Sequence, residues 1–138
     1  MEYNNAHEMT KNFTDIIAWQ ISHQFVIKVY KMTRTFPEIE RFGLISQFQR
    51  AAVSITANIA EGYRKIGKAD KLRFLNTSQG SLEECRNYII LSKDLEYINE
   101  EQYAELMSIL EKASWYINAY AKGILNNNAI ASCKGNVR

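Results

Sequence analysis

The sequence predicts an all-α protein, an antiparallel four-helix bundle with up-down-up-down topology. Three observations lead to this fold class. The chain of 138 residues contains one proline and six glycines, so few positions interrupt a helix. Four segments repeat apolar residues at spacings of three and four, which is typical of amphipathic helices. The connections between these segments are short, which makes consecutive helices antiparallel neighbours.

The first two helices are expected at residues 14–35 and 42–61. Thr14 is a suitable N-cap for the first helix, and Pro37 ends it because the residue before a proline disfavours the helical conformation. Gly62 is predicted to close the second helix in the left-handed conformation, at positive φ. The apolar face of the second helix consists of Leu44, Phe48, Ala52, Ile55 and Ile59.

The third helix is expected at residues 68–97, and the fourth helix runs to about Leu125. Large and small residues alternate along the inner face of the third helix, and Gly80-Ser81 lies in its middle, which predicts close approach to a neighbouring helix. Asn99 and Gln102 form a predicted capping box at the start of the fourth helix. The chain therefore divides into a flexible N-terminal arm, one bundle domain and a flexible C-terminal tail, at residues 1–13, 14–125 and 126–138.

Composition and cysteine usage are ordinary for a globular protein. The chain is 46% apolar and 23% charged, and its formal net charge is +2. Two cysteines are too few for a disulfide framework, and Cys85 is expected to be a small buried residue. The N-terminal residues lack the apolar core of a signal peptide, and no run of eighteen apolar residues occurs. A cytoplasmic protein that does not enter the membrane is expected.

Enzyme signatures are absent from the sequence. Neither His7 nor His23 has a partner at metal-ligand spacing, and no HExxH motif, CxxC pair or phosphate-binding glycine loop occurs. His23 is read as a surface residue of the first helix. Adjacent glutamates at 83–84 and 100–101 are read as solvated charges. We therefore expect no catalytic residue, no metal, no cofactor and no enzymatic activity.

A basic segment joins the second and third helices. Residues 51–75 carry five basic and two acidic side chains, whereas residues 76–112 carry three basic and eight acidic ones. Aromatic residues Tyr63 and Phe74 flank the segment, and basic patches next to aromatics can bind phosphates and unpaired bases. The alternative is a solvated basic loop. The candidate nucleic-acid-binding residues are Arg64, Lys65, Lys68, Lys71 and Arg73.

A polar stripe runs along the second helix, next to its apolar face. Its members are Gln47, Arg50, Ser54, Asn58 and Glu61. No residue from Ala51 to Ala60 is charged, although an exposed helix surface normally carries Lys and Glu. This helix is therefore predicted to be covered on more than one side, with the stripe at a subunit interface and Arg50 paired with Glu61 or another acid. The alternative is that the stripe closes within one monomer, against the third helix around Gly80-Ser81.

Two long segments carry a resemblance to a known family. FPEIERFGLISQFQRAAVSITANIAEGYRK and RFLNTSQGSLEECRNYIILSKDLEYI resemble bacterial four-helix bundle proteins encoded in intervening sequences of 23S rRNA genes. The most specific motifs are Asn-Ile-Ala-Glu-Gly at residues 58–62 and Gly-Ser-Leu-x-Glu at residues 80–84, and the resemblance covers residues 13–125. It implies a relation to the accessory protein of diversity-generating retroelements, a ring-shaped homopentamer that works with a reverse transcriptase.

Together these features predict a non-catalytic, oligomeric, RNA-associated protein. Its expected partners are further copies of itself, with a pentamer implied by the resemblance, and ribosomal or other structured RNA. The alternative is a protein–protein scaffold or accessory subunit, for example of a reverse transcriptase, with little RNA affinity of its own.

Overall fold

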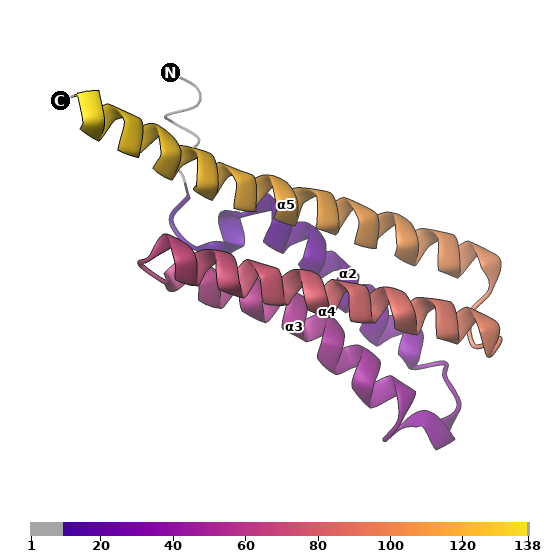
Figure 1. Cartoon of the computed structure of the whole chain (residues 1–138). Coiled ribbons are helices and arrows are strands. Elements are labelled where there is room, and N and C mark those ends of the chain that lie inside the picture. Colours follow the sequence, from indigo (N-terminus) through magenta and orange to yellow (C-terminus); the bar gives the residue numbers. More distant parts are fainter. Residues whose placement is uncertain (1–9, 138) are drawn as a thin grey trace.

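Four helices dominate the computed structural model, which describes the backbone of residues 10–137 and the side chains of residues 10–127. The elements are a 3-10 turn η1 (Phe13–Asp15), α2 (Ile17–Thr33), a 3-10 turn η2 (Glu38–Glu40), α3 (Leu44–Arg64), α4 (Lys68–Asp94) and α5 (Glu100–Val137). Helices α2 and α4 each pack against both α3 and α5, and the described residues contain no strand (Figure 1). The predicted all-α, antiparallel four-helix bundle is confirmed.

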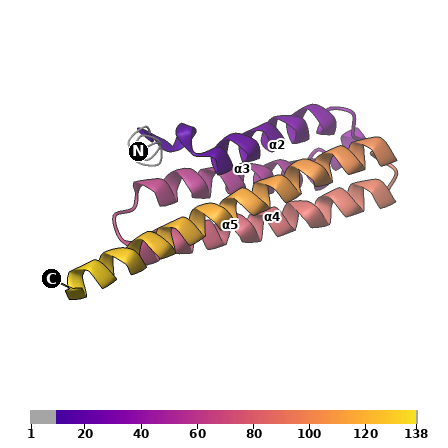
Figure 2. The ribbon, with the colours of Figure 1, turned by 90° about the horizontal axis from the view of Figure 1, so that it is seen from above.

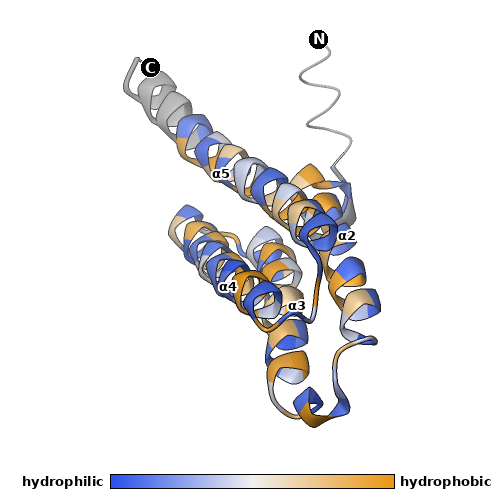
Figure 3. Ribbon diagram, turned by 90° about the vertical axis from the view of Figure 1, so that its right-hand side faces the viewer, coloured by the Kyte–Doolittle hydropathy of each residue, from blue (hydrophilic) through white to orange (hydrophobic). Residues whose placement is uncertain are grey.

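The core consists of the apolar stripes of the four helices. All five residues of the predicted apolar face of α3 are buried, and Phe48, Ile55 and Ile59 are completely so. Each side chain of this size stabilises the fold by roughly 1.5–3 kcal/mol when it is fully buried. Every helix still carries hydrophilic residues beside the hydrophobic ones, as expected for amphipathic helices around one core (Figure 3).

The first helical turn begins earlier than predicted. Asn12, not Thr14, is the cap: its Oδ1 accepts the N–H of Thr14 at 2.8 Å, and the Asp15 carboxylate accepts the N–H of Asn12 at 3.4 Å. This capping box holds η1, and α2 then starts at Ile17 without a side-chain cap. Thr14 was the wrong choice because Asn12 and Asp15 together satisfy more of the free N–H groups than one threonine could.

The predicted capping box at the start of α5 is present. The N–H of Asn99 donates to Gln102 Oε1 at 2.9 Å, and the N–H of Gln102 donates to Asn99 Oδ1 at 2.8 Å. Just before it, α4 ends at Asp94, short of the predicted Tyr97. Glu96 has φ 62°, and the N–H of Tyr97 bonds back to the carbonyl of Ser92 at 2.9 Å. The left-handed residue stops α4, although a glutamate gives no sequence signal for that conformation.

Gly62 does not close α3, so that prediction was wrong. The helix continues to Arg64, and none of the glycines in the described range has positive φ. A Cβ at Gly62 would lie 3.0 Å from Phe74 Cβ and 3.4 Å from the Lys71 carbonyl oxygen. Gly62 therefore allows α3 and α4 to approach closely. Both this role and the predicted role at a helix end favour glycine, because it has no Cβ.

Close approach to a neighbouring helix was predicted at Gly80-Ser81, and the structure shows it at Ser81 but not at Gly80. Gly80 is exposed, and a Cβ added there would have no neighbour within 4 Å. Ser78 and Ser81 face α3 instead, and Ser78 Oγ donates to the Ile55 carbonyl at 2.8 Å. Small hydroxyl side chains thus provide both the space and the hydrogen bonds at this contact.

Helix α5 extends beyond the predicted end at about Leu125. Its backbone stays helical to Val137, and this end projects past the other three helices (Figure 2). Residues 126–137 lack the apolar periodicity that would predict such an extension, but they contain no proline to stop the helix. Of the predicted N-terminal arm, residues 1–9 lie outside the described residues.

Candidate nucleic-acid interface

The basic segment lies at the end of the bundle where α3 passes into α4. Arg64 is the last residue of α3, Lys65 is its C-cap, and Lys68 is the first residue of α4. Ile66 at the apex of the connection is 99% exposed. Because the connection is so short, Arg64, Lys65 and Lys68 lie around a single turn.

Lys71 has a structural role in this segment. Its Nζ donates to the Tyr63 carbonyl at 2.7 Å and to the Gly62 carbonyl at 3.4 Å, and it lies 5.6 Å from the centre of the Tyr63 ring. These carbonyls belong to the last turn of α3, which no further helical turn follows to supply N–H donors, and the Gly62 carbonyl also accepts the N–H of Lys65 at 3.2 Å. Burial lowers the pKa of Lys71 from its ordinary value. Lys71 therefore caps α3 and ties it to α4.

Arg73 and Phe74 are also engaged. Arg73 forms an exposed ion pair with Asp70 at 3.1 Å, and its guanidinium lies 5.2 Å from the centre of the Phe74 ring. The Lys65 ammonium lies 5.1 Å from the same ring. Cations thus occupy Phe74, and Lys71 occupies Tyr63, so neither flanking aromatic is an open platform for a base.

Three members of the basic segment keep their charge available. Arg64 and Lys65 are exposed, Lys68 is half-buried, and none of the three forms an ion pair with another described residue. Of the five predicted residues, Lys71 therefore caps a helix and Arg73 is paired with Asp70, whereas the other three have no ion-pair partner in the described part of the chain. The free cations are Arg64, Lys65 and Lys68, which we call the free cation group.

The three uncharged residues of the polar stripe on α3 have hydrogen-bond partners inside the monomer. Ser54 Oγ lies 2.7 Å from Ser81 Oγ on α4, and Asn58 Nδ2 donates to the Ser54 carbonyl at 2.8 Å and to Ser54 Oγ at 3.0 Å. Gln47 Oε1 accepts the Tyr88 hydroxyl at 3.0 Å. The serines and the asparagine find the partners that half-buried polar groups require, but on α4 and on α3 itself.

Arg50 and Glu61, the two charged members of the stripe, are exposed, and neither forms an ion pair with a described residue. Within one subunit, the predicted pairing between them does not form. Eleven residues of helix separate their Cα atoms by about 16 Å, beyond the reach of the two side chains.

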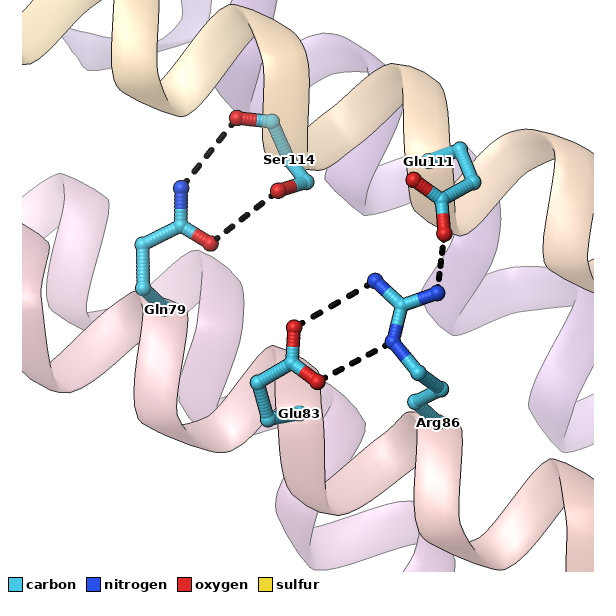
Figure 4. A network of polar contacts seen from close by, with 5 residues as sticks. All are labelled: Gln79, Glu83, Arg86, Glu111 and Ser114. Carbon is cyan, nitrogen blue, oxygen red and sulfur yellow. Dashed lines mark hydrogen bonds and ion pairs between the residues drawn. The ribbon is translucent and has the colours of Figure 1, made fainter.

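A polar network between α4 and α5 was not predicted. Gln79 Nε2 donates to the Ser114 carbonyl at 3.1 Å, and Arg86 pairs with Glu83 at 3.0 Å and also with Glu111 of α5 (Figure 4). The hydrogen bonds that Arg86 donates to the Glu83 carboxylate are the main cause that raises the pKa of Arg86. This network fixes the register of the two helices, and its exposed acidic residues surround Arg86.

An aromatic stack at the start of α2 was also missed. Trp19 and His23 stack with ring centres 4.6 Å apart and an interplanar angle of 13°, and Phe13 meets Trp19 edge-on at 5.3 Å and 69°. The signal was present, because residues four apart on a helix are neighbours. His23 is exposed, as predicted for a surface residue, and its stacking partner lies one helical turn before it.

The described side chains contain no group of three His, Cys, Asp or Glu residues that could hold a metal ion. Nor is any helix in this range both long and apolar enough to cross a membrane. Cys85 is buried, and burial raises the pKa of its thiol.

Comparisons with known proteins agree with the fold and with the resemblance. A crystal structure of a protein with unknown function from the S23 ribosomal protein family from Bacteroides thetaiotaomicron VPI-5482 matches 77% of this chain and 96% of its own, with a TM-score of 0.71 and 23% sequence identity. This likeness shows the shared fold. No curated protein sequence matches the chain. The model of the 23S rRNA-intervening sequence protein family matches residues 14–119. Since that match spans most of the chain, the protein belongs to the 23S rRNA-intervening sequence protein family.

Proposed function

We propose that this protein is a non-catalytic RNA-associated protein that contacts phosphates through the free cation group. The observation that carries the proposal is the position of Arg64, Lys65 and Lys68 around one turn, without ion pairs among the described residues. Cations that have no carboxylate partner are available to replace the counterions of an RNA backbone. Lys71 and Arg73 contribute less, because one caps α3 and the other is paired with Asp70.

The test is a binding titration with 23S rRNA fragments at several salt concentrations. In the triple variant Arg64→Gln, Lys65→Gln, Lys68→Gln, affinity should fall and the slope of log K against log salt should decrease by about 2–3, from roughly 0.7–0.9 per phosphate contact. Glutamine removes the charge and remains a polar residue that is compatible with a helix.

A charge-matched control exists at the opposite end of the bundle. Lys31, Arg34 and Arg41 lie at the end of α2 and in the connection to α3, and all three are exposed. Replacing these three by Gln changes the net charge equally but should leave the salt slope unchanged. If both triple variants lose affinity equally, the protein binds by overall charge alone and the assignment to the free cation group fails.

We further propose that the protein works as a homo-oligomer, with the outer face of α3 as the interface. Val53 is 40% exposed on this face, beside the half-buried Ala57 and Ala60, and small uncharged residues let helices of two subunits pack closely. The resemblance favours a pentamer. Light scattering coupled to size exclusion should give a defined oligomer that Ala57→Glu dissociates. A 16 kDa species at micromolar concentration would remove this part of the proposal.

A protein–protein scaffold is the second candidate, favoured by the connection between α2 and α3. Ile39 and Phe42 are 88% and 86% exposed there, on a turn held by Glu40, whose carboxylate accepts the Tyr97 hydroxyl at 2.9 Å. Exposed apolar side chains on a held turn are suited to a protein partner. Phe42→Ser should abolish binding of a partner such as a reverse transcriptase, and it should leave RNA affinity unchanged.

A further inference from the structure

The aromatic stack at the start of α2 has one ring that is open to solvent. Trp19 is half-buried and has Phe13 against its edge and His23 against its face. His23 is exposed, and Trp19 is its only ring partner among the described residues. The imidazole therefore forms the outer layer of a stack whose inner layers are already in place.

This stack lies at the same end of the bundle as the free cation group. The turn η1, which contains Phe13, packs against α3 as well as α2. Tyr63 directly precedes Arg64 in the sequence, and its hydroxyl donates to the Thr10 carbonyl at 3.4 Å. His23 lies six residues after the first residue of α2, about 9 Å along the helix from that end. An aromatic surface and a cationic surface thus lie at the same end of the bundle.

We propose that His23 is a stacking platform for an unpaired RNA base while the free cation group binds the adjacent phosphates. The proposal rests on the proposed function and narrows its substrate class to single-stranded or looped RNA. A paired base shields both of its faces in the A-form helix, so only a splayed base can stack on a side chain. Trp19 holds the imidazole in place before RNA arrives, which reduces the entropy lost when the base stacks.

The rings of Tyr63 and Phe74, at the same end of the bundle, are not open to a base. Lys71 covers the Tyr63 ring, and both Lys65 and Arg73 lie near the Phe74 ring. A base could reach those rings only by displacing a cation, whereas the ring contact of the exposed His23 among the described residues is with Trp19 on one face. The cations and the stacking surface are therefore separate, as binding to a strand of alternating phosphates and bases requires.

The experiment uses a 12-nucleotide oligoadenylate and a blunt RNA duplex of equal length as probes. The full chain carries Trp115→Phe, so that Trp19 is the one remaining tryptophan; Trp115 is 65% exposed and its replacement should not disturb the core. We expect oligoadenylate to change the Trp19 fluorescence on binding and to bind more tightly than the duplex at the same salt concentration.

Two substitutions at position 23 and one control separate stacking from other effects. His23→Ala should weaken oligoadenylate binding at least about fivefold, the lower end of what base–aromatic stacking contributes, and should leave duplex binding unchanged. His23→Phe should retain most of the affinity, because it keeps a planar ring. Gln24→Ala, at the neighbouring exposed position, should have no effect.

The results distinguish this inference from the proposed function. Equal binding of both probes, with no loss in His23→Ala, would overturn the base-stacking site and leave phosphate binding by the free cation group standing. Binding of neither probe would overturn both. A loss in His23→Ala that His23→Phe does not restore, or an equal loss for the duplex, would show that position 23 acts without stacking and would also overturn the inference.

Discussion

The close contact of α3 and α4 at Gly62 allows a quantitative prediction with an internal control. In Gly62→Ala the new Cβ would lie 3.0 Å from Phe74 Cβ and 3.4 Å from the Lys71 carbonyl oxygen, both of which are fixed to the backbone of α4. In Gly80→Ala the new Cβ would meet no atom within 4 Å, and this glycine also lies within a helix. The two substitutions are chemically identical and differ only in what the methyl group contacts.

The expected magnitudes follow from two opposing effects. Replacing a helical glycine by alanine stabilises the helix by about 1 kcal/mol, which is the whole effect at Gly80. At Gly62 the same gain is offset by overpacking, which costs about 1–3 kcal/mol in a well-packed contact. Gly80→Ala should therefore stabilise the protein, whereas Gly62→Ala should be neutral or destabilising. The difference in the free energy of unfolding should be about 1–3 kcal/mol, from the overpacking range alone.

Thermal and urea unfolding, followed by helical circular dichroism, measure this difference. For a chain of this size, 1 kcal/mol shifts Tm by about 3–5 °C, so the two variants should differ by at least that amount. Both variants must be measured at one protein concentration, because self-association makes Tm depend on concentration. If Gly62→Ala is stabilised as much as Gly80→Ala, α4 can move away at no cost, and the close-approach explanation of Gly62 is refuted.

Three further predictions concern hydrogen bonds and backbone conformation. Ser54→Ala should destabilise the fold by about 1–3 kcal/mol because it leaves the Ser81 hydroxyl buried without its partner; the double variant with Ser81→Ala should recover part of that loss in urea unfolding. Lys71→Met should lower stability by about 1 kcal/mol through loss of the α3 cap, whereas Lys68→Met should stay within about 0.5 kcal/mol and instead weaken RNA binding in the titration; the reverse pattern would exchange their roles. Glu96→Gly should raise the unfolding free energy by about 0.5–1 kcal/mol, since φ 62° strains a glutamate, and an unchanged Tm would speak against that strain.

The sequence by itself determined the fold class and much of each helix. Apolar residues at spacings of three and four follow from helix geometry alone, so all five residues predicted for the apolar face of α3 are buried, although the buried Ala51 and Gly62 were not among them. The Asn99–Gln102 capping box is equally local, because its two hydrogen bonds join residues three apart. The family was recognisable for the same reason: its motifs are short, contiguous and readable without knowledge of any contact.

Only the tertiary structure decided what lies across from each residue. Ser54 was rightly expected to need a partner, but whether this would be Ser81 or another subunit depends on the separation and rotation of α3 and α4. The same applies to Lys71, which looks like any other basic residue until α4 brings it to the last carbonyls of α3. Gly62 suits both a helix terminus and a close crossing. Periodicity is a property of one helix, whereas contacts between helices depend on distances of a few ångström that no single helix encodes.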